Sequence, residues 1–217
     1  MNYKNHKRLI TVSGLLVLVA VVIFIFFTKK DAPSLDEKQS DTIESTSDLK
    51  QEVVENSYKG FSESVYVSNI EKNILNKDYS VAEKIASEAL SFYPKSESIL
   101  NKMLIMLGEK GDIGGSLKIT DTLLEIDSKN YLYWKLKAKL ERAKITTYTI
   151  EQKKQIQDIY EKALVATSNN IEIISTYAVF AEEYLSKEKA IDLWNLAKKV
   201  NPLGAESYQV IIGRLEK

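Results

Sequence analysis

The chain of 217 residues contains no cysteine. Disulfide bonds, thiolate metal sites and a cysteine nucleophile are therefore excluded. Histidine occurs only once, as His6 in a basic stretch near the start, so catalytic triads and most zinc sites are excluded as well. We expect a protein that is not an enzyme, has no catalytic residues and holds no metal and no cofactor.

Proline and glycine are scarce, with three and eight residues respectively. Glycine gathers only in residues 111–115, which read GDIGG. This stretch lacks the Gly-Lys-Ser/Thr with which a phosphate-binding loop holds its ligand. Glu151, Glu182 and Glu183 have the spacing of ordinary helix-surface charges, and nothing pairs them as an acid and a base. Neither feature changes the expectation that the chain is not an enzyme.

Neither sign of charge is in excess, because 30 Lys and Arg balance 30 Asp and Glu. This balance excludes the strongly basic surface of a nucleic-acid-binding protein. The charges are unevenly spread, however. Residues 1–30 have five basic side chains and no acidic one, whereas residues 31–63 have nine acidic and three basic ones. The charge pattern therefore separates the start of the chain from the rest.

An uncharged run, LITVSGLLVLVAVVIFIFF, covers positions 9–27. As a helix it would reach about 28 Å, close to the hydrocarbon thickness of a bilayer. The alternative is a cleaved signal peptide, but its apolar core is shorter, about 7–15 residues, and no small-residue cleavage pattern follows this run. We predict a single transmembrane helix at 9–27 after a basic tail at 1–8. The small excess of Lys and Arg before the span favours a cytoplasmic N-terminus and an extracytoplasmic C-terminal domain.

Residues 28–61 are polar and acidic and contain few apolar side chains. Such a composition cannot offset the entropy lost on ordering the chain. We therefore predict a flexible linker at 28–61, followed by a folded domain at 62–217.

Three columns of residues repeat along that domain at successive intervals of 34, 40 and 34 in the sequence. A period of about 34 residues is the length of a helix–turn–helix unit that buries its apolar face only by stacking on its neighbours. Small residues in the columns let helices approach closely, and proline at the end of a unit stops its second helix. The columns are Ala82, Ser116, Ile156 and Ala190; Ala89, Leu123, Ala163 and Ala197; and Pro94, Ser128, Ser168 and Pro202.

These units resemble the tetratricopeptide repeat (TPR), most clearly in NKDYSVAEKIASEALSFYPKS (76–96) and SKEKAIDLWNLAKKVNPLG (186–204). A bulky residue occupies the fourth motif position in every repeat, and a small residue occupies the eighth position in two of the repeats. Three residues depart from the small side chain that the motif expects at its eighth or twentieth position. The fourth-position residues are Tyr66, Leu100, Trp134 and Ile174, the small eighth-position residues are Ala138 and Ala178, and the departures are Ile70, Leu104 and Ile156.

The resemblance implies an all-α, right-handed α-solenoid of about four helix pairs. We place the repeats at about 63–96, 97–130, 131–170 and 171–204, with a capping helix at 205–217. In the TPR family the first helices line a groove that binds protein or peptide partners. The groove residues that the motif register gives are Val67, Glu71, Ile74, Asn101, Ile105, Glu109, Lys135, Lys139, Arg142, Ser175, Val179 and Glu182.

Lys135, Lys139 and Arg142 lie at i, i+4 and i+7, which places three cations on one helical face. They form either a site for an acidic peptide or a C-terminal carboxylate, or a solvated charged face. The carboxylate clamp of chaperone-docking TPRs is not matched, since its positions hold Val67, Glu71, Lys102, Leu132 and Leu136.

The third repeat has six extra residues near 144–150. They form either a neutral surface insertion, or a lengthened second helix or protruding turn that contacts a partner. Thr149 and Gln152 have the spacing of a capping box at the start of a helix over 150–165.

Three functions fit this layout. A TPR scaffold outside the cytoplasm, in a layout similar to bacterial inner-membrane TPR proteins, would bind protein partners in envelope or secretory assembly. A cytosol-facing receptor for client proteins would require the opposite topology. A structural subunit would pack its span inside a larger membrane complex.

Overall fold

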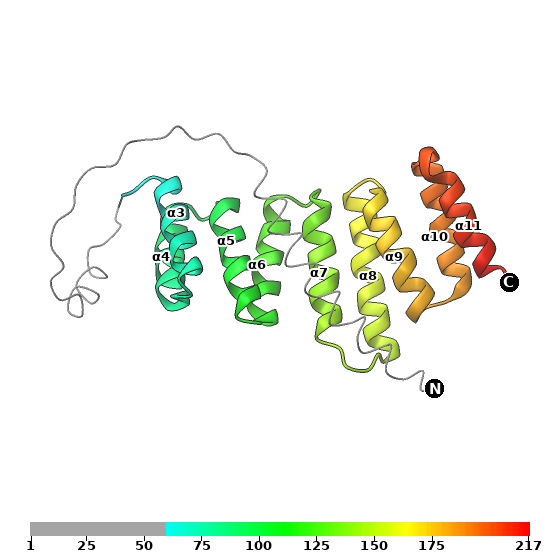
Figure 1. The fold of residues 1–217 in the computed structure, drawn as a ribbon, viewed down its shortest axis with the longest axis horizontal. Coiled ribbons are helices and arrows are strands. Elements are labelled where there is room, and N and C mark those ends of the chain that lie inside the picture. The colour runs from blue at the N-terminus through cyan, green and yellow to red at the C-terminus, as the bar shows by residue number, and fades with distance from the viewer. Residues whose placement is uncertain (1–59) are drawn as a thin grey trace, which may run out of the picture. The chain divides into compact units, whose positions relative to one another are not determined.

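The computed structural model describes residues 60–217, and every regular element in this part of the chain is a helix (Figure 1). Four helix pairs follow one another, and a short 3₁₀ turn, Pro202–Gly204, precedes the last helix. The helices are α3 (Glu63–Leu75), α4 (Tyr79–Phe92), α5 (Glu97–Glu109), α6 (Ile113–Ile126), α7 (Tyr131–Ala143), α8 (Ile150–Ala166), α9 (Ile171–Tyr184), α10 (Lys187–Val200) and α11 (Ala205–Leu215).

The predicted basic tail at 1–8, the predicted span at 9–27 and nearly all of the predicted linker at 28–61 lie outside the described residues. From Gly60 onward, none of the helices is both long and apolar enough to cross a membrane.

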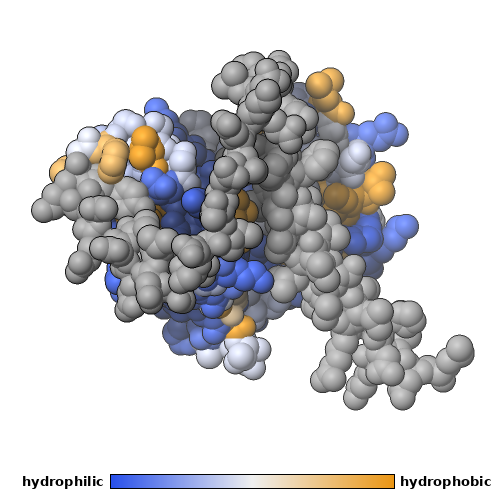
Figure 2. Space-filling model, turned by 60° about the vertical axis from the view of Figure 1, so that its left-hand side comes forward, coloured by the Kyte–Doolittle hydropathy of each residue, from blue (hydrophilic) through white to orange (hydrophobic). Residues whose placement is uncertain are grey.

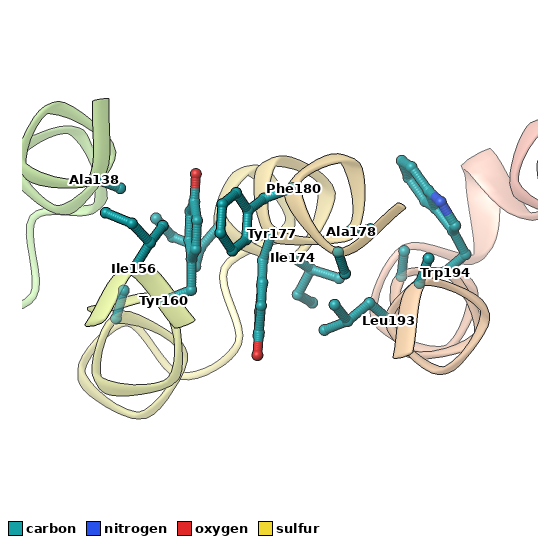
Figure 3. Packing of buried hydrophobic residues seen from close by; sticks show 14 of the residues in the cluster. Ala138, Ile156, Tyr160, Ile174, Tyr177, Ala178, Phe180, Leu193 and Trp194 are labelled. Atoms are coloured by element: carbon teal, nitrogen blue, oxygen red, sulfur yellow. The ribbon is translucent and has the colours of Figure 1, made fainter. Parts of the chain in front are cut away.

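The helices form two rows, which Figure 3 shows for the C-terminal half. First helices of the pairs, such as α7 and α9, lie in one row, and second helices, such as α8 and α10, lie in the other. Each first helix packs against its own second helix, α3 packs against α5, and α7 packs against α9. Helix α11 packs against α10. The helix-pair architecture that the repeat columns predict is therefore present.

The two columns within the second helices are buried along the whole array. Ala82 and Ala190 are fully buried, and Ser116 and Ile156 are only 4% and 1% exposed. At this position α4, α6 and α10 have a small side chain, whereas α8 has an isoleucine. The small residue that the motif expects is therefore present in three of the four described pairs. The second column is buried throughout, comprising Ala89, Leu123, Ala163 and Ala197.

The buried apolar residues of the described part of the chain fall into three clusters along the array. One joins α3, α4 and α5, and the largest runs from α7 to α11. The cluster between them is small, because it consists of only four buried residues, Leu100, Leu123, Leu124 and Tyr133. Repeats of this kind contact only their neighbours, so each cluster stabilises its own part of the row.

The turn within each pair depends on local backbone chemistry. Lys77 and Gly111, which occupy the same place in the first and second repeats, have φ angles of 62° and 68°. The same left-handed turn therefore ends α3 and α5, and only glycine adopts it without strain. The capping box is confirmed, since Thr149 and Gln152 exchange hydrogen bonds of 3.0 and 3.2 Å at the start of α8.

We expect Gly111→Ala to lower the free energy of unfolding by about 1–2 kcal/mol, because alanine must adopt the left-handed conformation. No atom beyond the chain neighbours lies within 4 Å of a Cβ at this position, so the cost is conformational rather than steric. Gly108→Ala is the matched control, since Gly108 lies in α5 with equally open surroundings. The control should raise stability by about 0.5–1 kcal/mol. Urea unfolding followed by circular dichroism measures both, and equal effects of the two substitutions would contradict the prediction.

Candidate partner-binding groove

Successive first helices are connected by polar side-chain contacts that run along one row of the array. Lys102 of α5 reaches back to Glu71 of α3, with 2.9 Å between Nζ and Oε1. Next along the row, the Tyr133 hydroxyl of α7 donates to Glu97 of α5 at 2.9 Å and accepts from Asn101 at 3.3 Å. These contacts connect three helices that belong to three different pairs.

The same pattern continues from α7 to α11. Lys135 pairs with Glu172 of α9 at 2.8 Å, and Arg142 pairs with Glu183 of α9 at 3.8 Å. Farther on, Arg214 of α11 pairs with Glu182 of α9. Each exposed pair contributes little to stability, about 0–1 kcal/mol. Together, however, these ion pairs neutralise most of the charged side chains that the motif register places in the groove.

Five predicted groove residues are therefore engaged within the chain, namely Glu71, Asn101, Lys135, Arg142 and Glu182. Glu109 is a sixth, because it accepts a 2.8 Å hydrogen bond from the Tyr79 hydroxyl. Lys139 is the exception among the three predicted cations: it is exposed, and no ion pair to it forms among residues 60–217. The three cations share a face, but they do not form a cluster of free positive charges.

Apolar side chains remain exposed between these polar contacts. Ile105 and Val179 are 37% and 51% exposed, and Val67 and Ser175 are half-buried. Ile74 differs from its prediction, because it is only 5% exposed and packs in the core of the first pair. It lies one helical turn after Ile70, on the face of α3 that is buried against the rest of the pair, and is not available to a ligand.

Leu132 belongs to the same surface but was not predicted as a groove residue. It lies at the second motif position of α7 and is 55% exposed. The motif register could have indicated it, since second positions also face the groove in the TPR family. On the face shown in Figure 2, the visible apolar side chains form separate spots among hydrophilic ones rather than one broad patch.

The six extra residues of the third repeat fold back against α9. The ring of Tyr148 lies 4.1 Å from that of Tyr184 and 6.2 Å from that of Phe180. Arg142 lies over the same two rings, 5.4 Å from Phe180 and 5.7 Å from Tyr184. The insertion is thus held against α9 by Tyr148, while Lys144, Thr146, Thr147 and Thr149 stay exposed. The second helix that follows it, α8, has 17 residues where α4, α6 and α10 have 14.

The aromatic core beneath the insertion is tightly stacked (Figure 3). The rings of Tyr160 and Tyr177 lie 5.0 Å apart and nearly parallel. Burial raises the pKa of the Tyr177 hydroxyl, and so does the 3.0 Å hydrogen bond that it donates to Glu161. The hydroxyl therefore stays neutral and structural at ordinary pH. Among residues 60–217, no group of His, Asp and Glu has the geometry to hold a metal ion.

No protein-family model matches the chain, and no curated protein matches it in sequence. Several solved structures are similar in fold. MamA aligns at 14% identity with a TM-score of 0.50, over 70% of this chain and 80% of that one. A MamA structure from Desulfovibrio magneticus RS-1, residue 41 to the end, aligns at 16% identity with a TM-score of 0.48, over 70% of this chain and 82% of that one. TTC0263, a thermophilic TPR protein of Thermus thermophilus, aligns at 13% identity with a TM-score of 0.45, over 71% of this chain and 85% of that one.

At these identities the similarity concerns the fold alone. The described part of the chain is all-helical, is built of helix-pair repeats and has a TPR-like fold. The resemblance that the repeat columns predict is confirmed to this extent.

Proposed function

We propose that this chain is a membrane-tethered scaffold whose helical array binds protein partners through the groove of its first helices. One observation carries the proposal. The groove's charges are mostly paired with each other, while Ile105, Leu132 and Val179 stay exposed between them. A partner that covered this surface would bury these apolar side chains among polar ones, the composition that protein interfaces have.

The paired charges also favour one class of partner over another. Lys135 and Arg142 are already bound to carboxylates of α9, so an acidic peptide would have to displace them. Of the three predicted groove cations, Lys139 is the one that has no ion pair within the described part of the chain, residues 60–217. We infer that apolar side chains of the partner supply most of the contact and that charge gives a minor part of it.

The membrane tether rests on the sequence. The run at 9–27 carries no charge, and the linker at 28–61 would hold the array away from the bilayer. We place the array outside the cytoplasm, in a bacterial inner membrane, where it would take part in envelope or secretory assembly. A cytosol-facing client receptor and a structural subunit of a larger membrane complex are the alternatives.

We expect Ile105→Asp and Leu132→Asp to weaken partner binding by about tenfold or more, because each places a charge where an apolar side chain is buried on binding. Both side chains are partly exposed, so the array should fold with either change. Val165→Asp is the matched control, since Val165 is 84% exposed on α8, in the other row of helices. Quantitative co-purification of cross-linked partners measures the effect. An equal loss of partner binding in all three variants, or no loss of binding in any of them, would contradict the groove proposal.

The topology has a separate test, which the absence of cysteine makes simple. We expect Ser40→Cys to react with a membrane-impermeant maleimide in cells whose outer barrier is opened but whose inner membrane is intact. Ser13→Cys, inside the predicted span, is the buried control and should stay unlabelled. Protection of position 40 until the inner membrane is broken would favour the cytosol-facing receptor.

A further inference from the structure

The third-repeat insertion, residues 144–149, forms one wall of a hollow beside the C-terminal end of α7. The hollow encloses about 590 Å³, a size typical of small-ligand sites. In Figure 1 the connection from α7 to α8 runs along the lower edge of the array, where the other described pairs have turns of at most three residues. Helix α7 contributes Lys139 and Arg142 to the lining, the insertion contributes Thr146, Thr147 and Tyr148, and α9 contributes Tyr184.

Positive charge dominates this hollow. Its lining includes Lys139 and Arg142, and no carboxylate of the described part of the chain lines it. Lys139 has no ion pair within that part. Arg142 lies 3.8 Å from Glu183, which is longer than a hydrogen bond, and Glu183 lines the neighbouring hollow between α9 and α11 instead. A guanidinium has five N–H donors, so Arg142 keeps donors for a ligand although it also interacts with Tyr148 and Tyr184.

Hydroxyl groups supply further donors. Thr146 and Thr147 are exposed, and their hydroxyls form no hydrogen bond with any residue from 60 to 217. Each can donate one hydrogen bond to an anion. Burial, and next the neighbouring Glu183, raises the pKa of the Tyr184 hydroxyl, so this group stays neutral at ordinary pH. The hollow therefore combines two cations with neutral hydroxyl groups and gains no negative charge from its own lining.

We propose that this hollow binds the phosphate group of a phosphate monoester. Two sources share this chemistry, namely a soluble phosphorylated metabolite and the headgroup of phosphatidic acid in a membrane. Ile145 and Tyr148 in the same lining offer apolar surface to the organic part of either ligand. The site is separate from the proposed scaffold function and does not require it.

The donor set favours phosphate over carboxylate. A phosphate monoester has close to two negative charges at neutral pH and three terminal oxygens, which can accept from Lys139, Arg142 and the two threonines. A carboxylate has one charge and two oxygens, so it satisfies fewer of these donors. Hydrogen bonds between charged groups are the stronger ones, which makes the doubly charged ligand the better fit to two cations.

The absence of cysteine allows a single ¹⁹F probe to be placed at the hollow. Ala143→Cys, at an exposed position that lines the hollow, would carry a trifluoroethylthio group on the full chain in phosphatidylcholine nanodiscs. We expect inorganic phosphate and glycerol 1-phosphate to shift this signal, with half-saturation at roughly 1–10 mM. Sodium acetate and sodium chloride at the same ionic strength should shift it much less. The same probe at Val165→Cys, on α8 in the other row of helices, should not respond.

Two sets of changes test the donors separately. Lys139→Gln, and Thr146→Val combined with Thr147→Val, should each raise the half-saturation concentration about threefold to tenfold. All three side chains are exposed, so these variants should fold, which circular dichroism checks. Lys154→Gln is the matched control, because Lys154 is an exposed lysine of α8 outside the hollow, and it should leave the titration unchanged.

Nanodiscs that contain phosphatidic acid distinguish the two sources. If the headgroup is the ligand, the signal at position 143 should be shifted there before any phosphate is added, and Lys139→Gln should reverse that shift. If the ligand is soluble, the signal should start unshifted in these nanodiscs and respond to glycerol 1-phosphate. The proposed site is overturned if neither phosphate source moves the signal or if acetate or chloride moves it as far. It is also overturned if Lys139→Gln and the threonine changes leave the response intact.

Discussion

Replacing Phe180 by alanine should lower the free energy of unfolding by about 3–5 kcal/mol, the typical cost of removing a buried phenyl ring. Phe180 is fully buried, and its ring lies 5.6 Å from that of Tyr160 and 5.2 Å from that of Tyr184. It also supports Arg142, whose guanidinium lies 5.4 Å from the ring. The substitution therefore removes core packing and the surface on which the third-repeat insertion rests.

Hydrogen exchange resolved along the chain can measure this loss region by region. Exchange should accelerate in α8, α9 and residues 144–149, while α3 and α4 change little, because their core cluster is separate from that of α7 to α11. Val179→Ala is the matched control, since Val179 is the neighbouring residue and 51% exposed. It should change the stability by less than about 1 kcal/mol. Uniform acceleration from α3 to α11 would show instead that the array unfolds as one cooperative unit.

The sequence predicts best those elements in which the same type of residue fulfils the same structural role in successive pairs. Ala89 and Ala197 recur because two helices approach closely at each, and the spacing alone shows it. The capping box at Thr149 is equally readable, since both of its hydrogen bonds join residues three positions apart. The predicted helix bounds at 150–165 differ from those of α8 by one residue at the C-terminal end.

Contacts between residues far apart in the sequence could not be predicted in this way. The motif register places Lys135 and Arg142 on the groove face, but it does not show that Glu172 and Glu183 reach them from the next first helix. The packing of Tyr148 on Tyr184 is also invisible to a repeat pattern, because the insertion interrupts the period. The sequence thus indicated which surface carries these side chains. Whether each side chain is free to bind a partner depends on its contacts with the neighbouring repeat.

Ala197→Leu should lower the free energy of unfolding by about 1–3 kcal/mol, because a larger side chain must force α10 away from its neighbours. Ala197 is fully buried in the cluster from α7 to α11.

The same column holds Leu123, also fully buried, in the small cluster between α5, α6 and α7. Leu123→Ala should therefore lower the free energy of unfolding by about 2–5 kcal/mol, because it leaves a cavity. The same column thus needs a small side chain at position 197 and a large one at position 123. Ala143→Leu, at an exposed position of α7, is the control and should stay within about 0.5 kcal/mol of the unchanged chain. Urea unfolding measures all three, and a stabilising Ala197→Leu would show that the contact surface of α10 has room that its alanine does not use.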